Sequence, residues 1–294
     1  MRSSSIDISS RGSTRNSETK NQKRDSGGGK GAVSLISIGP GNPQFIAGKA
    51  LEALKSSDYI VGYTKYVELI KPLFPEKSYI AKGMRQELDR CRIAVRLARD
   101  GNRVALISSG DVGIYGMAGA LFDYCRIENV PIASPEGVKG EELIIEVIPG
   151  VSALNAAASI LGAPLGHDFA VISLSDHLTP WQTIKTRLDA AAKADFVIVI
   201  FNPRSKSRPY ILKKAIHVIE KHLEPTRPVG IVKRATRQGQ ERIITSISAI
   251  PYIEVDMQTI IIIGNRSTYV WNNWMITPRG YEEKYYGVDA RETL

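Results

Sequence analysis

A segment with regularly spaced glycines, residues 108–119, is the part of the chain most suggestive of chemistry. Its glycines stand at positions 110, 113, 116 and 119, and Asp111 lies among them. Glycines remove side chains along a turn, so that a ligand can lie against backbone N–H and C=O groups. An aspartate in such a turn can face a sulfonium or ammonium group. A closely packed turn in which Asp111 caps a helix explains the same pattern, and both interpretations stay open at this point.

Two further segments of small residues have the same character. Residues 39–43 follow an apolar run, with Asn42 placed to cap a helix and a proline directly after it. The segment is not a dinucleotide-binding fingerprint, because Gln44 replaces the third glycine. Residues 149–153 follow another apolar run, and Ser152 is a natural helix cap. Taken alone, each segment is explained as well by a turn or a capped helix as by a ligand.

Two basic segments, residues 202–205 and 232–237, also end apolar runs, in the second half of the chain. Surface charge is the usual role of such lysines and arginines. However, loops at strand ends are where open α/β sheets bind ligands. Five special loops drawn from both halves therefore favour one shared cleft over five unrelated features.

Several other kinds of chemistry find no support in the sequence. The two cysteines form no CxxC pair, and the four histidines lack HxxH or HExxH spacing, so no metal site or disulfide framework is indicated. The nucleophile elbow of hydrolases and the phosphate loop of kinases are missing. No apolar run approaches the roughly 18 residues of a membrane-spanning helix. We expect a protein of the reducing cytoplasm without a membrane partner.

The loops must be positioned by alternating strands and helices, which is the pattern of βαβ units. The predicted strands are continuously apolar, as is typical of sheets covered on both faces. They span residues 33–38, 58–61, 103–107, 143–148, 170–174, 196–201, 229–232 and 259–263. Helices are predicted at 45–56, 85–100, 154–159, 181–192 and 210–222.

A segment rich in glycine and proline, residues 161–166, interrupts this series and is the predicted domain boundary. It divides the chain into an N-terminal α/β domain, 31–162, and a C-terminal α/β domain, 163–294. Residues 1–30 carry seven Lys or Arg against three Asp or Glu and lack apolar periodicity. We predict that they form a disordered basic tail. The net charge of +9 suits nucleic acid, an anionic membrane or a small polyacid, and does not choose among them.

From residue 33 to residue 281 the chain resembles the tetrapyrrole (corrin/porphyrin) methylases. GPG at 39–41, GDVGIYG at 110–116 and VIPGVSA at 147–153 carry the resemblance. Residues 173–181, 202–205 and 263–281 closely match the branch of the family that methylates carbon 17 of precorrin-3B. Residues 133–142 form a longer link than is usual in the family. The resemblance implies two α/β domains with mainly parallel or mixed sheets, an active site in the cleft between them, and a homodimer.

The resemblance also implies that S-adenosylmethionine lies in the cleft, held largely by backbone contacts. The residues expected around it are Pro40, Ser109, Gly110, Asp111, Ile114, Tyr115, Ser152, Ala153, Asn202 and Ala235. The implied reaction methylates carbon 17 of precorrin-3B, contracts the ring and releases a proton from a hydroxyl group. The alternatives are the cobalt-containing substrate of the same step, cobalt-factor III, an RNA-modifying methyltransferase of the same superfamily, and a non-catalytic regulatory protein.

A tetrapyrrole with acetate and propionate arms needs cationic or N–H-donating walls. The residues predicted to contact it are Gly39, Arg204, Lys233, Arg234 and Arg266. Asp176 and His177 are the candidate acceptors of the released proton, although a helix-entry aspartate is more often a cap. An RNA partner lacks the support of a basic stripe interleaved with aromatic residues, and none is expected.

Overall fold

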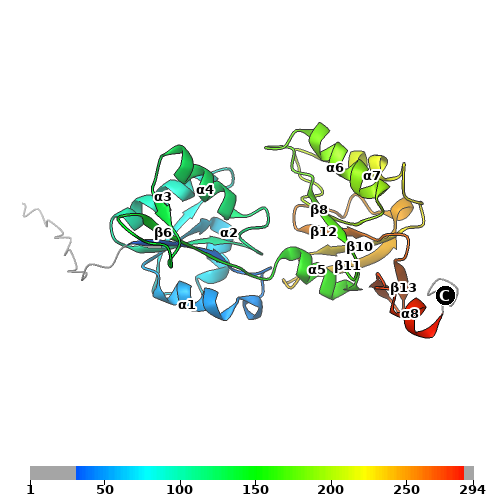
Figure 1. The fold of residues 1–294 in the computed structure, drawn as a ribbon, viewed down its shortest axis with the longest axis horizontal. Helices are drawn as coiled ribbons and strands as arrows, with labels where there is room; N and C mark the ends of the chain where they lie inside the picture. Colours follow the sequence, from blue (N-terminus) through cyan, green and yellow to red (C-terminus); the bar gives the residue numbers. More distant parts are fainter. Residues whose placement is uncertain (1–30, 288–294) are drawn as a thin grey trace, which may run out of the picture.

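The computed structural model describes residues 31–287, without the side chains of residues 282 and 283. The predicted tail, residues 1–30, lies outside the described residues. Alternating strands and helices build two layered α/β bodies that are joined by the passage from β6 to α5 (Figure 1). All eight predicted strands are present, and each has its ends within two residues of the predicted ones. The predicted fold class, two α/β units with parallel and mixed sheets, is confirmed.

The first body is a six-stranded sheet in the order β3-β2-β4-β1-β6-β5, and every pairing is parallel. Its strands are β1 (Ala32–Ser37), β2 (Tyr59–Tyr63), β3 (Ser78–Lys82), β4 (Arg103–Ser108), β5 (Ile132–Ala133) and β6 (Leu143–Ile148). The carboxyl ends of all six strands therefore lie along one edge of the sheet.

Helices cover both faces of the first sheet. Leu35 and Leu106 face α3 and α4, whereas their neighbours Ile36 and Ile107 face α1 and α2. This two-sided burial explains why the strands are continuously apolar. The helices are η1 (Pro43–Phe45), α1 (Gly48–Ser56), α2 (Thr64–Ile70), α3 (Glu87–Arg99) and α4 (Met117–Ile127).

The second body is a five-stranded mixed sheet in the order β11-β10-β12-β9-β8. Strands β8 and β9 are parallel, β12 is antiparallel to β9 and β10, and β11 is antiparallel to β10. The strands are β8 (Phe169–Ser173), β9 (Val197–Phe201), β10 (Pro228–Lys233), β11 (Glu241–Ser246) and β12 (Thr259–Ile263). One edge of the sheet thus holds the carboxyl ends of β8, β9 and β10 and the amino ends of β11 and β12.

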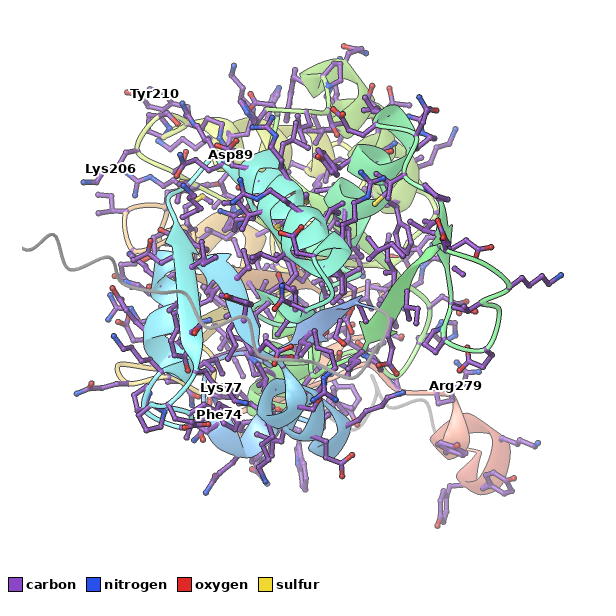
Figure 2. The ribbon with its side chains drawn as sticks, turned by 90° about the vertical axis from the view of Figure 1, so that its left-hand side faces the viewer. Phe74, Lys77, Asp89, Lys206, Tyr210 and Arg279 are labelled. Carbon is purple, nitrogen blue, oxygen red and sulfur yellow. The ribbon has the colours of Figure 1, made fainter. Side chains whose placement is uncertain are left out.

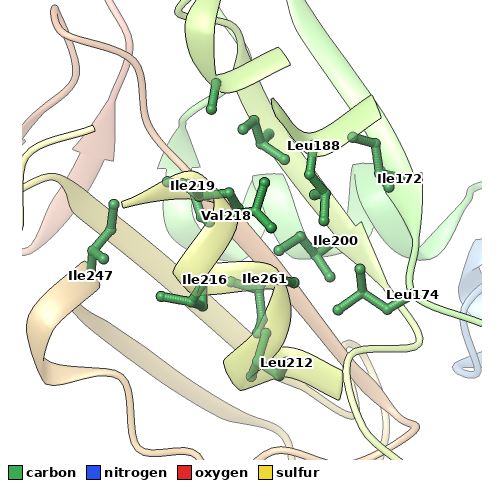
Figure 3. Close-up of a cluster of buried hydrophobic side chains, with 14 of the residues drawn as sticks. Ile172, Leu174, Leu188, Ile200, Leu212, Ile216, Val218, Ile219, Ile247 and Ile261 are labelled. Carbon is green, nitrogen blue, oxygen red and sulfur yellow. The ribbon is translucent and has the colours of Figure 1, made fainter. Parts of the chain in front are cut away.

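Helices α6 (Trp181–Lys193) and α7 (Ile211–Ile219) cover one face of this sheet, and α5 (Ala153–Leu161) covers the other (Figure 1). Figure 3 shows the core below α6 and α7, in which Leu188 and Ile216 pack near Ile200 and Ile261. The 3-10 helix η2 (Ile247–Ala249) follows β11.

The packing of α5 bears on the domain division. Leu154 and Leu161 lie in one buried cluster with Val199 of the second sheet. The predicted boundary between residues 162 and 163 falls at the end of this helix. We propose instead that the linker is residues 149–152, before α5.

A small third sheet completes the second body. It has the order β13-β14-β7 and is built from β7 (Gly162–Ala163), β13 (Tyr269–Trp271) and β14 (Trp274–Ile276). The last described helix, α8 (Tyr281–Tyr286), projects away from both bodies beyond Arg279 (Figure 2).

Candidate active site

The loops at the carboxyl ends of the two sheets face each other, and hydrogen bonds join them. Tyr115 of the first body donates its hydroxyl to the carbonyl of Val171 at 3.1 Å. Arg237 of the second body donates to the carbonyl of Pro40 at 2.6 Å and to the hydroxyl of Ser109 at 2.7 Å. Three of the loops singled out in the sequence, residues 39–43, 108–119 and 232–237, therefore meet between the two bodies.

Three loops of the first body are in direct backbone contact. Gly39 and Gly110 exchange N–H···O bonds of 3.2 and 2.6 Å. Both have positive φ angles, +70° and +68°, which favour glycine. A Cβ atom on Gly150 would lie 2.5 Å from Cβ of Ser37, so the third loop also approaches closely. The close approach of these three loops leaves room only for small residues. Their surface therefore consists of main-chain groups rather than side chains.

Asp111 ties two of these loops together. Its carboxylate accepts the N–H of Gly113 at 2.8 Å and the N–H of Gly150 at 2.9 Å. Helix α4 begins only at Met117, and its N-cap residue, Gly116, makes no side-chain cap. The interpretation of Asp111 as a helix cap is thus wrong, whereas its role toward a bound cation stays a prediction.

The glycines of the same segment have different roles. A Cβ atom on Gly116 would lie 2.4 Å from the carbonyl oxygen of Val112, so packing excludes a side chain there. A Cβ atom on Gly119 would meet nothing within 4 Å. Close packing therefore requires only part of the glycine pattern.

Two predicted caps are confirmed. The Ser152 hydroxyl accepts the N–H of Asn155 at 3.2 Å and begins α5, which places Ala153 at the first turn of that helix. The Asn42 side chain accepts the N–H of Gln44 at 3.0 Å. The predicted helix from residue 45 is divided, because Asn42 caps the short helix η1 and α1 begins separately at Gly48.

Tyr115 and Asn202 have backbone conformations that are uncommon for residues other than glycine, both with φ of 52°. The Tyr115 ring packs 5.3 Å from the ring of Phe201, and burial raises the pKa of its phenol, which stays a hydrogen-bond donor at neutral pH. Asn202 donates to the hydroxyl of Ser173 at 2.9 Å. Ala235 is buried in the second body, while Ile114 is exposed.

Two of the predicted substrate-binding cations are engaged within the second body. Arg204 donates to the carbonyls of Tyr252, Ile253 and Val255 at 3.1, 2.8 and 3.4 Å. Lys233 lies 3.8 Å from Glu241 and 3.6 Å from Asp256. Both side chains therefore stabilise the fold of the second body beside the cleft.

Arg266 lies at the opposite edge of the second sheet. Its guanidinium donates to Asp195 at 2.8 Å, just before β9. The loop after β12 points away from the cleft because β12 runs antiparallel to its neighbours. The structure does not bring Arg266 together with the other predicted residues, and we leave it out of the proposed site.

Arg234 and Arg237 line a cavity of about 480 Å³ between the two bodies. Arg234 is exposed and donates to the side chain of Gln258 at 3.2 Å. Leu69 of α2 and the turn at Gly41 close the cavity from the first body. Sequence reasoning did not select Arg237, although it ends the basic segment after β10 and lies against Gly41.

The candidate proton acceptors lie in the loop after β8. The Asp176 carboxylate is 3.6 Å from Arg208, whose guanidinium also donates to the carbonyl of Leu174 at 2.7 Å. His177 is exposed and makes no hydrogen bond or ion pair with another described residue.

Neither a metal-binding cluster nor a membrane-spanning helix is found within residues 31–287. No group of three or more His, Cys, Asp or Glu side chains in this range could hold a metal ion. No helix in the same range is both long and apolar enough to cross a membrane.

Comparison with known proteins extends this description. The cobalt-factor III methyltransferase of Priestia megaterium is 44% identical over 257 residues. The match covers 87% of this chain but only 46% of that protein. A probable cobalt-factor III C(17)-methyltransferase of Salmonella typhimurium is 45% identical, covering 85% of this chain and 99% of that one. The precorrin-3B C(17)-methyltransferase of a Sinorhizobium species is 36% identical, with coverage of 85% and 97%.

Solved structures support the same fold. The crystal structure of the methyltransferase CobJ has a TM-score of 0.77 and 35% identity, covering 84% of this chain and 100% of that one. A uroporphyrin-III C-methyltransferase from Thermus thermophilus, solved with S-adenosylhomocysteine, has a TM-score of 0.59 and 23% identity, and covers 80% and 97%. The family model of the Tetrapyrrole (Corrin/Porphyrin) Methylases matches residues 32–251. The chain therefore belongs to the tetrapyrrole methylase family.

Proposed function

We propose that this protein transfers a methyl group from S-adenosylmethionine to carbon 17 of a tetrapyrrole precursor of the corrin ring, in cobalamin biosynthesis. The observation that carries the proposal is its identity of 36–45% to relatives named for this methylation, with nearly the whole length of two of them covered. The meeting of the predicted loops between the two bodies supports it.

The residues of the cleft fit the methyl donor. Gly39 and Gly110 have no side chains, and Ser152 and Ala153 keep the neighbouring loop small. A Cβ atom on Gly110 would lie 3.5 Å from the backbone nitrogen of Ala153, so a ligand here lies against the main chain. The carboxylate of Asp111 is the anionic group beside this surface. Such donors and acceptors suit a compact ligand that carries an ammonium, a carboxylate and a sulfonium.

When bound, S-adenosylmethionine supplies an electrophilic methyl group. The protein has to align that group with the attacking carbon at about 3–3.5 Å and to exclude water. A nucleophilic side chain is not needed, because the electron-rich tetrapyrrole provides the attacking carbon. Tyr115 and Phe201 form an aromatic wall across the cleft, and this wall limits the access of water.

The tetrapyrrole lies, in this proposal, against the exposed cation Arg234 and the turn at Gly39. Arg204 and Lys233 act indirectly, since their charged groups already bind the backbone and carboxylates of the second body. In this proposal, Arg204 and Lys233 therefore stabilise the surface that the pigment contacts and do not bind the pigment themselves.

We propose Asp176 as the group that accepts the proton released during ring contraction. Arg208 orients its carboxylate, whereas the imidazole of His177 lacks such a partner. The replacement Asp176→Asn should lower kcat about 100-fold, within the usual range for a general base, and leave the affinity for the donor unchanged. The replacement His177→Ala should keep the wild-type rate. The reverse result would assign the role to His177.

The cobalt-containing substrate is the version that we favour. Relatives named for cobalt-factor III are 44–45% identical to this chain, and the relative named for precorrin-3B is 36% identical. The RNA-modifying alternative has no comparable support. We further propose that the protein is a cytoplasmic homodimer, which light scattering on the purified full chain would test.

The test is turnover by the full-length chain. Incubation with S-adenosylmethionine and either cobalt-factor III or precorrin-3B should yield a product heavier by one methyl group, with the methyl located at carbon 17 by NMR. A faster reaction of the cobalt compound supports the favoured version. Methylation at another carbon, or no reaction of either compound, would refute the proposal.

A further inference from the structure

The cavity beside the turn at Gly41 combines two arginines with no acidic lining residue. Arg234 and Arg237 come from the loop after β10, and the other lining side chains are neutral. Asp256, which stands two residues before the lining residue Gln258, is engaged by Lys233. A concave surface of this charge attracts anions.

Arg237 is held in the cavity without an anionic partner. Among the side chains that the structure describes, no carboxylate lies within ion-pair distance of it. Its guanidinium donates instead to a neutral carbonyl, that of Pro40, and to a neutral hydroxyl, that of Ser109. Burial lowers the pKa of this guanidinium, which still remains protonated at neutral pH. A partly buried charge with neutral partners gains strongly when a carboxylate reaches it.

The turn at Gly41 is shaped to admit this side chain. A Cβ atom on Gly41 would lie 2.4 Å from both Cγ and Nε of Arg237. Glycine therefore provides the space in which the arginine crosses between the two bodies. The side chain of Thr236, from the same loop, accepts the N–H of Asn42 at 3.4 Å and holds the two segments together.

The location of the cavity favours the pigment over the methyl donor as the source of the anion. None of the ten residues expected around S-adenosylmethionine lines it. Leu69 and Gln258 line the cavity, whereas Tyr115 and Asn202 do not. Arg237 contacts both regions, because it lines the cavity and donates to Pro40 and Ser109.

We propose that this cavity is a subsite for one carboxylate arm of the tetrapyrrole and that Arg237 is its principal cation, with Arg234 in support. The inference rests on the proposed function, because it takes the anionic pigment as the substrate. Because Arg237 also contacts the loops of Pro40 and Ser109, it links the position of the pigment to the loops expected to hold the donor.

The test is a binding titration of the full chain with uroporphyrin III, a porphyrin with eight carboxylates. Fluorescence measures the binding. Arg237→Gln should weaken binding about tenfold, as expected for one charged hydrogen bond, and Arg237→Lys should restore part of the affinity. Arg234→Gln should weaken it about threefold, since that side chain is exposed. Affinity for S-adenosylhomocysteine should stay within about twofold in Arg234→Gln. In Arg237→Gln it should fall less than the affinity for uroporphyrin III, although this side chain also contacts Pro40 and Ser109.

The matched control is Arg126→Gln, which removes the same charge from the far end of α4, where the side chain is 78% exposed. Equal porphyrin affinity in Arg237→Gln and Arg126→Gln would overturn the proposal. A loss that Arg237→Lys does not restore at all would also overturn it, because the bonds to Pro40 and Ser109 would then be the whole role. A loss confined to S-adenosylhomocysteine would assign the subsite to the donor's carboxylate.

Failure of this inference is distinct from failure of the proposed function. Porphyrin binding needs no turnover, so the subsite is tested even if carbon 17 is not methylated. Conversely, wild-type turnover with no effect of Arg237→Gln on pigment affinity or KM would remove the subsite and leave the reaction in place.

Discussion

The loops after β4 and after β10 face each other, yet they are built differently. The first is shaped by backbone bonds, among them those between Gly39 and Gly110, and it sends the uncharged Tyr115 across the cleft. The second contains positive φ angles at Arg234 and Thr236 and sends the cation Arg237 across in the other direction. The contrast suggests that the first loop fits one small ligand closely, whereas the second recognises charge.

The residue types of the two bodies allow them to be followed separately. Both cysteines, Cys91 and Cys125, lie in the first body, and all three tryptophans, Trp181, Trp271 and Trp274, lie in the second. Thiol reactivity therefore reports on the first body, and tryptophan fluorescence reports on the second.

The largest effect is expected from Gly110→Val. A β-branched residue at φ of +68° carries backbone strain of about 1–3 kcal/mol, and the turn must shift to relieve it. Affinity for S-adenosylhomocysteine, measured by calorimetry, should fall ten- to one-hundred-fold. The affinity for uroporphyrin III should change little. Equal losses of both affinities would remove the distinction between the two loops.

Gly119→Ala is the matched control within the same segment, because its Cβ atom would meet no other atom within 4 Å. Helix α4 should be stabilised by about 0.5–1 kcal/mol. A loss of donor affinity in this variant would show that the whole glycine pattern serves the ligand.

Arg204→Ala tests whether the cation in the loop after β9 is structural. Loss of three bonds to carbonyls should destabilise the second body by about 2 kcal/mol. The urea midpoint read by tryptophan fluorescence should fall, while the midpoint read by thiol exposure should not. Arg204→Lys should recover part of the loss. A raised KM with an unchanged urea midpoint would instead support the direct contact between Arg204 and the substrate that was predicted from the sequence.

Tyr115→Phe should have a smaller effect. It removes the bond to the carbonyl of Val171, worth about 1 kcal/mol, and keeps the ring against Phe201. We expect kcat/KM to fall about fivefold in steady-state assays. Tyr115→Ala, which removes the ring as well, should lose more. Equal losses in the two variants would place the whole contribution in the hydroxyl.

The smallest effect concerns the thiols of the first body under native conditions. Burial raises the pKa of Cys91 to about 12 and also raises that of Cys125. Neither thiol should react quickly with a disulfide reagent at pH 8, and both should react in urea. Since the folded pKa is raised, the stability that these thiols contribute is complete below the unfolded pKa. It is lost as pH rises from there through the raised pKa of each thiol, which is about 12 for Cys91. Fast labelling at pH 8 would contradict this burial.

The sequence predicted features that depend on neighbouring residues. The caps at Asn42 and Ser152 are local hydrogen bonds, and the strands are apolar because both faces of each sheet are covered. Strand direction is not local. Arg266 ends an apolar strand as Arg204 does, yet it lies at the other edge because β12 runs antiparallel.

The roles of the cations could not be predicted for a related reason. Arg204 binds carbonyls about fifty residues away, and Arg237 binds Pro40 and Ser109, which are further still along the chain. The sequence predicted Arg204 as a substrate contact and did not select Arg237. The available signal for Arg237 was the glycine at position 41, whose missing side chain makes room for it.

The three bonds from Arg204 have a consequence for protein engineering. They attach residues 252–255 to the end of β9, so that one side chain anchors this segment and the two could be exchanged together. Exchanging it between family members together with the arginine would change this part of the second body while its anchor is kept. The backbone turns of the first body would keep their geometry, so that the proposed donor site would not need to be redesigned.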